Sequence, residues 1–346
     1  MNINQNYEEL KNFFDKFENH QTHHRLEPPD AVVEPTFGIL DLLKSLMTTD
    51  LTNSFLPTTL NEPLTTTHVK LSNHKRTCEI FKNYHLLNTA ANTTNIIDRL
   101  AYVGAFVIST GYWMTPHRSH KPFNSVLGET YEYVDAQNKI LVLCEQVSHH
   151  PPQTACHIQS ENWELTFLLN QKILFLLTKL KIKSKTKLFI RFKDGNEFYA
   201  FLPNIYIHDL RAKYPWTEYK GKVTIHHNLT ISKAVIEFTG CENYSRENCT
   251  IFDNDGKEQA TIKGSYLGRV LYSKTGTPGE TIWERNPFIT FVDYFGFSHH
   301  TLQLNDPNYH VTCPTDARKR PDVRALETGD VNIFLLSTQV QIWRGK

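Results

Sequence analysis

The strongest chemical signal in the sequence is a pair of adjacent histidines followed by two prolines, His149-His150-Pro151-Pro152. The pair follows an apolar run, 140–144, that is typical of a buried strand. Pro151 disfavours helical backbone at His150 and has no N–H to donate. The pattern therefore predicts that a strand ends here and that two imidazoles sit in a stiffened loop. Imidazoles in such a place can bind an anion or a metal, or transfer a proton.

A second set of polar groups, Lys121 and Asn124, suits an anion. A phosphomonoester carries close to two negative charges and several acceptor oxygens. Lysine suits it as a point charge, histidine as a donor that the phosphate helps to protonate, and asparagine through its amide. Each residue also has an ordinary explanation, because a lone histidine pair is usually structural and a lone lysine usually lies on the surface.

Metal and catalytic sites are weakly supported. His117 and His120 have the spacing of a metal pair on a helix, but no third ligand is near them, so we expect no metal site. A hydrolase would use Ser148 or Glu145 with His149. Neighbours on an extended chain point to opposite faces, and no hydrolase or nucleotide-binding motif is present, so we expect no enzyme.

Composition excludes several classes of protein. The 346 residues carry a formal net charge of +1, which argues against a nucleic-acid binder that works through bulk positive charge. No apolar run approaches the ~18 residues of a membrane span, and the N-terminus lacks the apolar core of a signal peptide. The six cysteines form no Cys-x-x-Cys pair and are expected to be reduced thiols. These features predict a protein of the cytosol.

The order of elements predicts a mainly β protein. From about 130 to 300, alternating runs recur between turn signals, at 187–192, 198–202, 222–226 and 234–238. The stretches 193–196 and 253–256 supply tight turns, and 98–106 is typical of a helix. Strands without intervening helices favour one large antiparallel barrel or sandwich over an α/β sheet. Near the N-terminus, apolar residues recur at helical spacing: Tyr7, Leu10, Phe13, Phe14 and Phe17.

Several stretches together resemble the oxysterol-binding-protein-related lipid-transfer family. The octapeptide Glu145–Pro152 matches its fingerprint residue for residue, and 121–132 departs only at Ser125, where proline is commoner. The stretch 314–327 is nearly the family sequence, and shorter matches cover 55–64 and 98–106. The resemblance extends from about Phe55 to Asp330.

The resemblance implies an all-β-dominated fold with flanking helices. It is a large incomplete antiparallel β-barrel that encloses a lipid tunnel, with an N-terminal helical lid and a C-terminal α/β extension. We therefore divide the chain into an amphipathic lid or arm, 1–35, and a lipid-transfer domain, 36–346. The barrel core would run to about 300, and a C-terminal subdomain would cover 301–346. The N-terminal helix either packs on the core or acts as a lid that touches a membrane through Leu10, Phe13, Phe14 and Phe17.

The resemblance also implies ligands. In the family, the matching lysine, asparagine and paired histidines bind the head group of phosphatidylinositol 4-phosphate, so that role passes to Lys121, Asn124, His149 and His150. The second ligand would be a sterol or phosphatidylserine, carried in the same tunnel, and no cofactor is implied. The expected function is exchange of these lipids between membranes, at the membrane surface and at contact sites of the endoplasmic reticulum. The alternative is a lipid sensor or scaffold that binds without efficient exchange.

The family's final helix is not matched. Relatives place Lys, Glu and Arg four residues apart on one face, where this chain has Thr338, Ile342 and Lys346. Either the chain has diverged there or its natural end is missing. The missing groups predict weaker phosphoinositide binding than in complete relatives.

Two further stretches suggest partners. Residues 12–18 resemble the two-phenylalanine acidic motif that binds VAMP-associated proteins, although Lys16 stands where a small residue is usual, and we prefer the lid or packed helix. The run Arg318-Lys319-Arg320 could touch anionic lipid. A solvated or salt-bridged loop explains Arg318 and Arg320 better.

Overall fold

The computed structural model describes residues 9, 12, 14, 79, 81–112, 114, 125–149, 151–176, 179–209, 216–241, 244–285, 299–304, 306, 309 and 313–328. Six residues of the predicted sites lie outside this part of the chain: Leu10, Phe13, Phe17, Lys121, Asn124 and His150. The stretch 329–346, with Thr338, Ile342 and Lys346, lies outside it as well.

A short helical segment precedes the strands. It contains η2 (Phe81–Asn83), α4 (His85–Ala91) and α5 (Ile96–Ser109). Asn95 caps α5, because its Oδ1 accepts the backbone N–H groups of Ile97, at 2.9 Å, and Asp98, at 3.2 Å. Such a cap satisfies donors that the first helical turn leaves without partners. The helix predicted over 98–106 is confirmed as part of α5.

In the described part of the chain, fourteen strands form one antiparallel sheet. They are β1 (Thr130–Asp135), β2 (Ile140–His149), β3 (Pro152–Gln159), β4 (Trp163–Leu176), β5 (Lys179–Ser184), β6 (Lys187–Phe192), β7 (Glu197–Phe201), β8 (Asn204–His208), β9 (Trp216–His227), β10 (Lys233–Cys241), β11 (Tyr244–Phe252), β12 (Glu258–Gly264), β13 (Arg269–Lys274) and β14 (Glu280–Glu284). The order is β1-β2-β3-β4-β5-β8-β9-β10-β11-β12-β13-β14, while β6 pairs with β4 and β7, and β7 with β9. All these pairings are antiparallel, as the sequence predicts.

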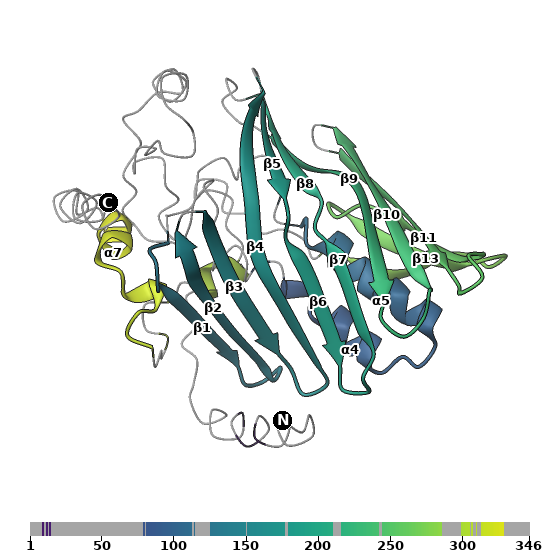
Figure 1. Cartoon of the computed structure of the whole chain (residues 1–346), viewed down its shortest axis with the longest axis horizontal. Coiled ribbons are helices and arrows are strands. Elements are labelled where there is room, and N and C mark those ends of the chain that lie inside the picture. The colour runs from purple at the N-terminus through teal and green to yellow at the C-terminus, as the bar shows by residue number, and fades with distance from the viewer. Residues whose placement is uncertain are drawn as a thin grey trace.

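The sheet curves around α4 and α5 (Figure 1). We call the side that bears these helices the inner face and the opposite side the outer face. Gly104 of α5 lies so close to the sheet that a Cβ there would be 3.0 Å from Ile262 Cδ1, with Cys249 and Ile225 next nearest. On β4, the indole of Trp163 donates to Asn88 of α4 at 2.6 Å. Side chains on the inner face are accordingly buried, and alternate residues face outward.

Two terminal segments pack on this sheet. The described C-terminal part contains α6 (His299–Leu304), η3 (Ala317–Lys319) and α7 (Pro321–Thr328), and Asp316 forms a bridge to Thr130 of β1. Near the N-terminus, Phe14 is 1% exposed and packs against Val134 of β1 and Leu141 of β2. No described helix is both long and apolar enough to cross a bilayer.

Candidate functional site

His149 lies at the end of a strand, as the sequence predicts. Strand β2 ends at His149, and β3 begins at Pro152, which is the cross-strand neighbour of His149. The Ser148 hydroxyl donates to the carbonyl oxygen of Pro151 at 2.7 Å, which closes the loop between the two strands.

A β-bulge sets the direction of His149. The pairing of β2 with β3 shifts between Gln146 and Ser148. Before the shift, odd-numbered residues of β2, such as Leu143, face outward. One extra residue reverses the alternation, so His149 comes to the same face as Gln146, the inner face. The Nδ1 atom of His149 is buried, in agreement with this direction.

The side chain of Gln146 holds the bulge in place. Gln146 is 1% exposed, and its Nε2 donates to the carbonyl of Ser148 at 2.6 Å. Its Oε1 accepts the hydroxyl of Thr154 on β3 at 2.8 Å. These two bonds stabilise the bulge, because breaking either one leaves a buried polar atom without its partner.

The described part of the stretch 121–132, which also resembles the family, lies beside the bulge at Gln146. The backbone N–H of Gly128 donates to the carbonyl of Gln146, and the N–H of Gln146 donates to the carbonyl of Glu129, both at 2.9 Å. The segment that follows Asn124 therefore lies beside the octapeptide. Its first described residue, Ser125, is fully buried.

A buried triad of charged residues joins the stretch 314–327 to this site. Arg320 donates to Glu129 Oε2 at 2.6 Å and to Asp322 Oδ2 at 2.5 Å. All three residues are buried. Burial by itself would lower the pKa of the Arg320 guanidinium, but Glu129 and Asp322 outweigh it, and the pKa is raised. Arg320 is thus held charged between two carboxylates.

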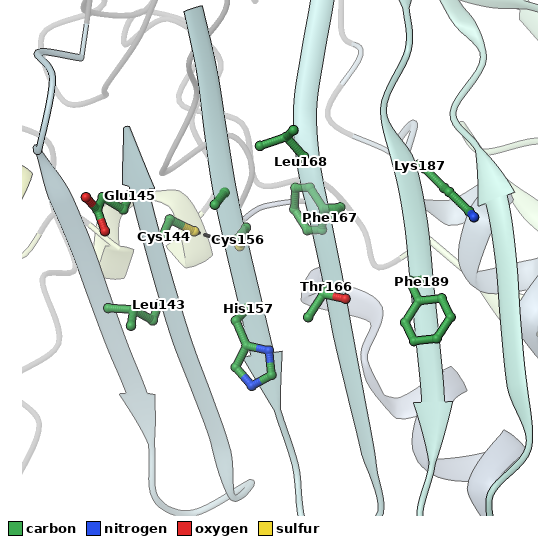
Figure 2. Close-up of a pocket in the computed structure, with 11 residues that line it drawn as sticks. Leu143, Cys144, Glu145, Cys156, His157, Thr166, Phe167, Leu168, Lys187 and Phe189 are labelled. Atoms are coloured by element: carbon green, nitrogen blue, oxygen red, sulfur yellow. Dashed lines mark hydrogen bonds between the residues drawn. The ribbon is translucent and has the colours of Figure 1, made fainter. Parts of the chain in front are cut away.

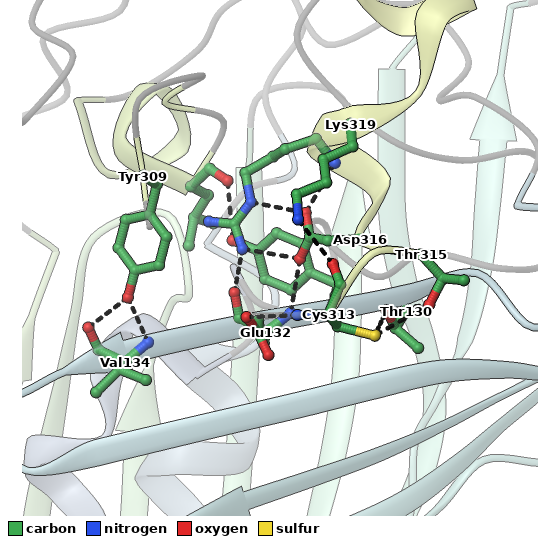
Figure 3. A network of polar contacts seen from close by, with 11 residues as sticks. Thr130, Glu132, Val134, Tyr309, Cys313, Thr315, Asp316 and Lys319 are labelled. Atoms are coloured by element: carbon green, nitrogen blue, oxygen red, sulfur yellow. Dashed lines mark hydrogen bonds and ion pairs between the residues drawn. The ribbon is translucent and has the colours of Figure 1, made fainter. Parts of the chain in front are cut away.

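A second buried arginine fastens the same segment to β1 (Figure 3). Arg318 pairs with Asp316, with Nε and Oδ1 2.9 Å apart, and donates to the carbonyl of Glu132. Its guanidinium lies 4.5 Å from the ring centroids of both Tyr131 and Tyr309. The salt-bridged interpretation of Arg318 and Arg320 is confirmed, and neither faces a membrane.

A sequence profile for a family described as oxysterol-binding protein matches residues 38–333. The chain belongs to the oxysterol-binding protein family. Oxysterol-binding protein-related protein 6 of Homo sapiens is 32% identical over 306 residues, which cover 85% of this chain and 32% of that protein. Human oxysterol-binding protein-related protein 3 is 31% identical over 317 residues, covering 88% of this chain and 34% of that protein. The chain spans about a third of the length of these relatives.

Solved structures of oxysterol-binding domains share the fold. The Osh1 ORD domain in complex with cholesterol superposes with a TM-score of 0.85 at 24% identity, covering 98% of this chain and 86% of that one. The Osh3 ORD in complex with PI(4)P from Saccharomyces cerevisiae superposes with a TM-score of 0.81 at 25% identity, covering 93% and 87%. The predicted family and fold class are therefore confirmed.

Within this oxysterol-binding fold, the structure describes one of the four predicted head-group residues, His149. Gln146, Thr154 and Glu129 also shape the site, although none of them was among the predicted site residues. A signal was available for Gln146, because a glutamine in an otherwise apolar inward series, with Val142 and Cys144, calls for a polar partner.

A pocket of about 550 Å³ lies on the other face of the sheet (Figure 2). Outward residues of β2, β3, β4 and β6 contribute to it, among them Leu143, His157, Leu168 and Phe189. His149 faces the opposite side of the sheet. This outer pocket is therefore separate from the predicted head-group site.

Two histidines of β9, His226 and His227, have structural roles. Hydrogen bonds join His227 to Thr230, at 2.7 Å, and to Asn196, at 2.8 Å, and its ring stacks on Phe198. Burial lowers the pKa of His227. His226 stacks on Tyr199 with ring centroids 4.9 Å apart.

Proposed function

We propose that this chain is a lipid carrier that binds a sterol, or phosphatidylserine, and exchanges it for phosphatidylinositol 4-phosphate between membranes. The observation that carries the proposal is the bulge at Gln146, which turns His149 to the inner face, beside the segment that follows Asn124. The Osh domains of the same fold, one with cholesterol and one with PI(4)P, support the same ligand classes.

Lipid carriage requires an enclosed apolar space. Each buried CH₂ is worth about 0.8 kcal/mol, so a chain of about 18 carbons is held in a bilayer by roughly 14 kcal/mol. A protein offsets this only by offering comparable apolar surface. We place the lipid chain on the inner side of the sheet, towards which His149 faces, and the head group at Lys121, Asn124, His149 and His150.

The N-terminal helix keeps two proposed roles. Leu141, which contacts Phe14, lies eight residues before His149 on β2, which is about 26 Å of extended strand. Phe14 cannot touch a membrane while it is packed there. A lid movement, or binding of a VAMP-associated protein through residues 12–18, would have to withdraw Phe14 from Val134 and Leu141.

The test removes the two imidazoles together. His149→Ala with His150→Ala should abolish extraction of phosphatidylinositol 4-phosphate from vesicles and leave the circular dichroism spectrum and melting temperature unchanged. The matched control is His157→Ala with His226→Ala, which removes two imidazoles from the outer face. Native mass spectrometry of the purified protein should show a bound sterol or phospholipid. Extraction by the His149 and His150 variant at the unaltered rate would overturn the assignment.

A sensor or scaffold is the second candidate. Thr338 and Ile342 lack the charged groups that relatives place there. A protein of this kind would bind the phosphoinositide but would not transfer sterol or phosphatidylserine between vesicles when a phosphoinositide gradient is supplied. A gradient-dependent rate of transfer excludes this candidate.

A further inference from the structure

A cluster of lysines and aromatic rings occupies the outer face where β4, β5, β8 and β9 meet. We call it the basic patch, and its members are Lys172, Lys179, Lys181, Lys183, Tyr206, Trp216 and Lys220. None of these residues takes part in the site around Gln146.

Strand register places these side chains on one face. Lys181 of β5 lies opposite Tyr206 of β8, which in turn lies opposite Glu218 of β9. The alternate residues Ile182 and Ile205 are buried on the inner face. Lys181, Tyr206 and Glu218 therefore lie together on the outer face.

Three ammonium groups surround one ring. The Nζ atoms of Lys181, Lys179 and Lys220 lie 5.3, 5.7 and 6.0 Å from the ring centroid of Tyr206. The ring's negative face attracts each of them, while the like charges repel one another.

The carboxylates beside the patch include exposed Asp209, which accepts the indole N–H of Trp216 at 2.8 Å, and buried Glu218. Glu218 is 2% exposed and lies 3.5 Å from Lys220 Nζ and 2.9 Å from His208 Nε2, so one buried carboxylate serves two groups. In the described part of the chain, no ion pair joins Lys172, Lys179, Lys181 or Lys183 to a carboxylate. An anionic surface laid against the patch would lower its electrostatic energy.

Apolar groups alternate with the lysines. Leu174 lies opposite Lys181, and Leu176 lies opposite Lys179 and is 40% exposed. Trp216 stacks on His208 with ring centroids 4.0 Å apart. Lysine, leucine and tryptophan on one face match the interfacial layer of a bilayer, where amphipathic rings and basic groups both find partners.

The patch lies beyond the strand end that carries His149. Gln153, next to the octapeptide loop, pairs with Asn170 of β4, and β4 continues from there to Leu176. In Figure 1, β4 and β5 rise at the same end of the sheet as the end of β2. A surface bound to this extension would face the end of the sheet where His149 lies.

We propose that the basic patch docks the protein on an anionic lipid bilayer. The patch contacts phosphatidylserine-type head groups through its lysines, and Leu176 and Trp216 reach the interfacial layer. Docking would give the lipid carrier a defined orientation at the membrane. The purpose of the docking therefore rests on the proposed carrier function.

The experiment measures binding to phosphatidylcholine vesicles with and without phosphatidylserine. Each lysine near an anionic bilayer contributes about a factor of five, so Lys179→Gln with Lys181→Gln should weaken binding about 30-fold. The matched control is Lys257→Gln with Lys263→Gln, two exposed lysines on other strands and turns, which should bind like the unaltered protein. Added salt should reduce the difference between the variants.

A second ligand separates docking from carriage. Short-chain phosphatidylinositol 4-phosphate, presented without vesicles, should bind the patch variant normally and fail to bind the His149 and His150 variant. Equal binding of the patch variant and the control to anionic vesicles overturns the docking proposal. The proposal is also overturned if the unaltered protein binds equally well to vesicles with and without phosphatidylserine. If only the patch variant loses vesicle binding, and the unaltered protein extracts no lipid from vesicles, the docking proposal stands and the carrier function is wrong.

Discussion

The direction of His149 depends on one extra residue in β2. Without the shift between Gln146 and Ser148, His149 would continue the outward series of Leu143 and would face away from the barrel interior. The bulge persists because the buried Gln146 side chain bonds both to Ser148 and to Thr154. A buried amide with these bonds thus acts as a positioning group for an imidazole three residues away.

Removing the hydroxyl of Thr154 tests this role. Thr154→Val has nearly the same shape but takes the donor from Gln146 Oε1, so it should reduce the free energy of unfolding by about 1–3 kcal/mol. It should also weaken binding of phosphatidylinositol 4-phosphate, because the bulge loses a support. Urea denaturation and vesicle extraction measure the two effects. Thr154→Ser keeps the hydroxyl and should restore lipid binding; equal binding by the Val and Ser variants would argue against a positioning role.

Among elements, two segments nearly two hundred residues apart are joined through buried charges. Glu129 precedes β1, whereas Arg320 and Asp322 lie at the start of α7, and 191 positions separate Glu129 from Arg320. Because Glu129 also bonds through its backbone to Gln146, α7 is coupled to the octapeptide loop. The C-terminal segment therefore stabilises the predicted head-group site through the contacts of Arg320 with Glu129 and of Glu129 with Gln146.

Loss of Arg320 should be far more damaging than loss of its neighbour. Arg320→Met leaves two buried carboxylates uncompensated and should cost about 3–5 kcal/mol of unfolding free energy. Lys319→Met alters an exposed lysine and should change stability by less than about 1 kcal/mol. Adding Glu129→Gln and Asp322→Asn to Arg320→Met should recover much of the loss, as measured by thermal denaturation. Equal stability of the two single variants would contradict a supporting role for the triad.

At the scale of the whole molecule, folding buries a carboxyl group that remains protonated at neutral pH. Glu247 of β11 is fully buried, and burial raises the pKa of its carboxyl to about 8, although the N–H of Tyr266 and the hydroxyl of Ser245 partly oppose the rise. The folded state therefore holds a proton that the unfolded chain releases above its ordinary pKa of 4.5. The stability that this proton provides is complete below that value and is lost as pH rises through about 8.

The protein should consequently become less stable in alkali. Between about pH 6 and pH 9, the free energy of unfolding should fall by about 2–3 kcal/mol from this group. Glu247→Gln keeps the shape without a titrating proton and should remove most of that fall. Urea midpoints across the pH range measure it, with Glu258→Gln, at an exposed position, as the control. A pH profile that Glu247→Gln leaves unchanged would show that other groups cause the dependence.

The family, the antiparallel strands and the place where β2 stops could all be predicted from the order of amino acids alone. These features have local causes: alternating burial in runs such as 187–192, proline after His150, and turn residues such as Gly195, whose φ of 87° suits glycine. Side-chain period and turn chemistry depend on neighbours in the chain, so they can be predicted without coordinates.

Three features could be seen only in the folded molecule: the face that His149 occupies, the burial of Arg318 and Arg320, and the lysines of β5 and β9 around Tyr206. A bulge changes the register between two strands, and an ion pair forms between residues far apart in the chain. Neither leaves a periodic pattern in the sequence, because each depends on which partner the folded sheet brings alongside.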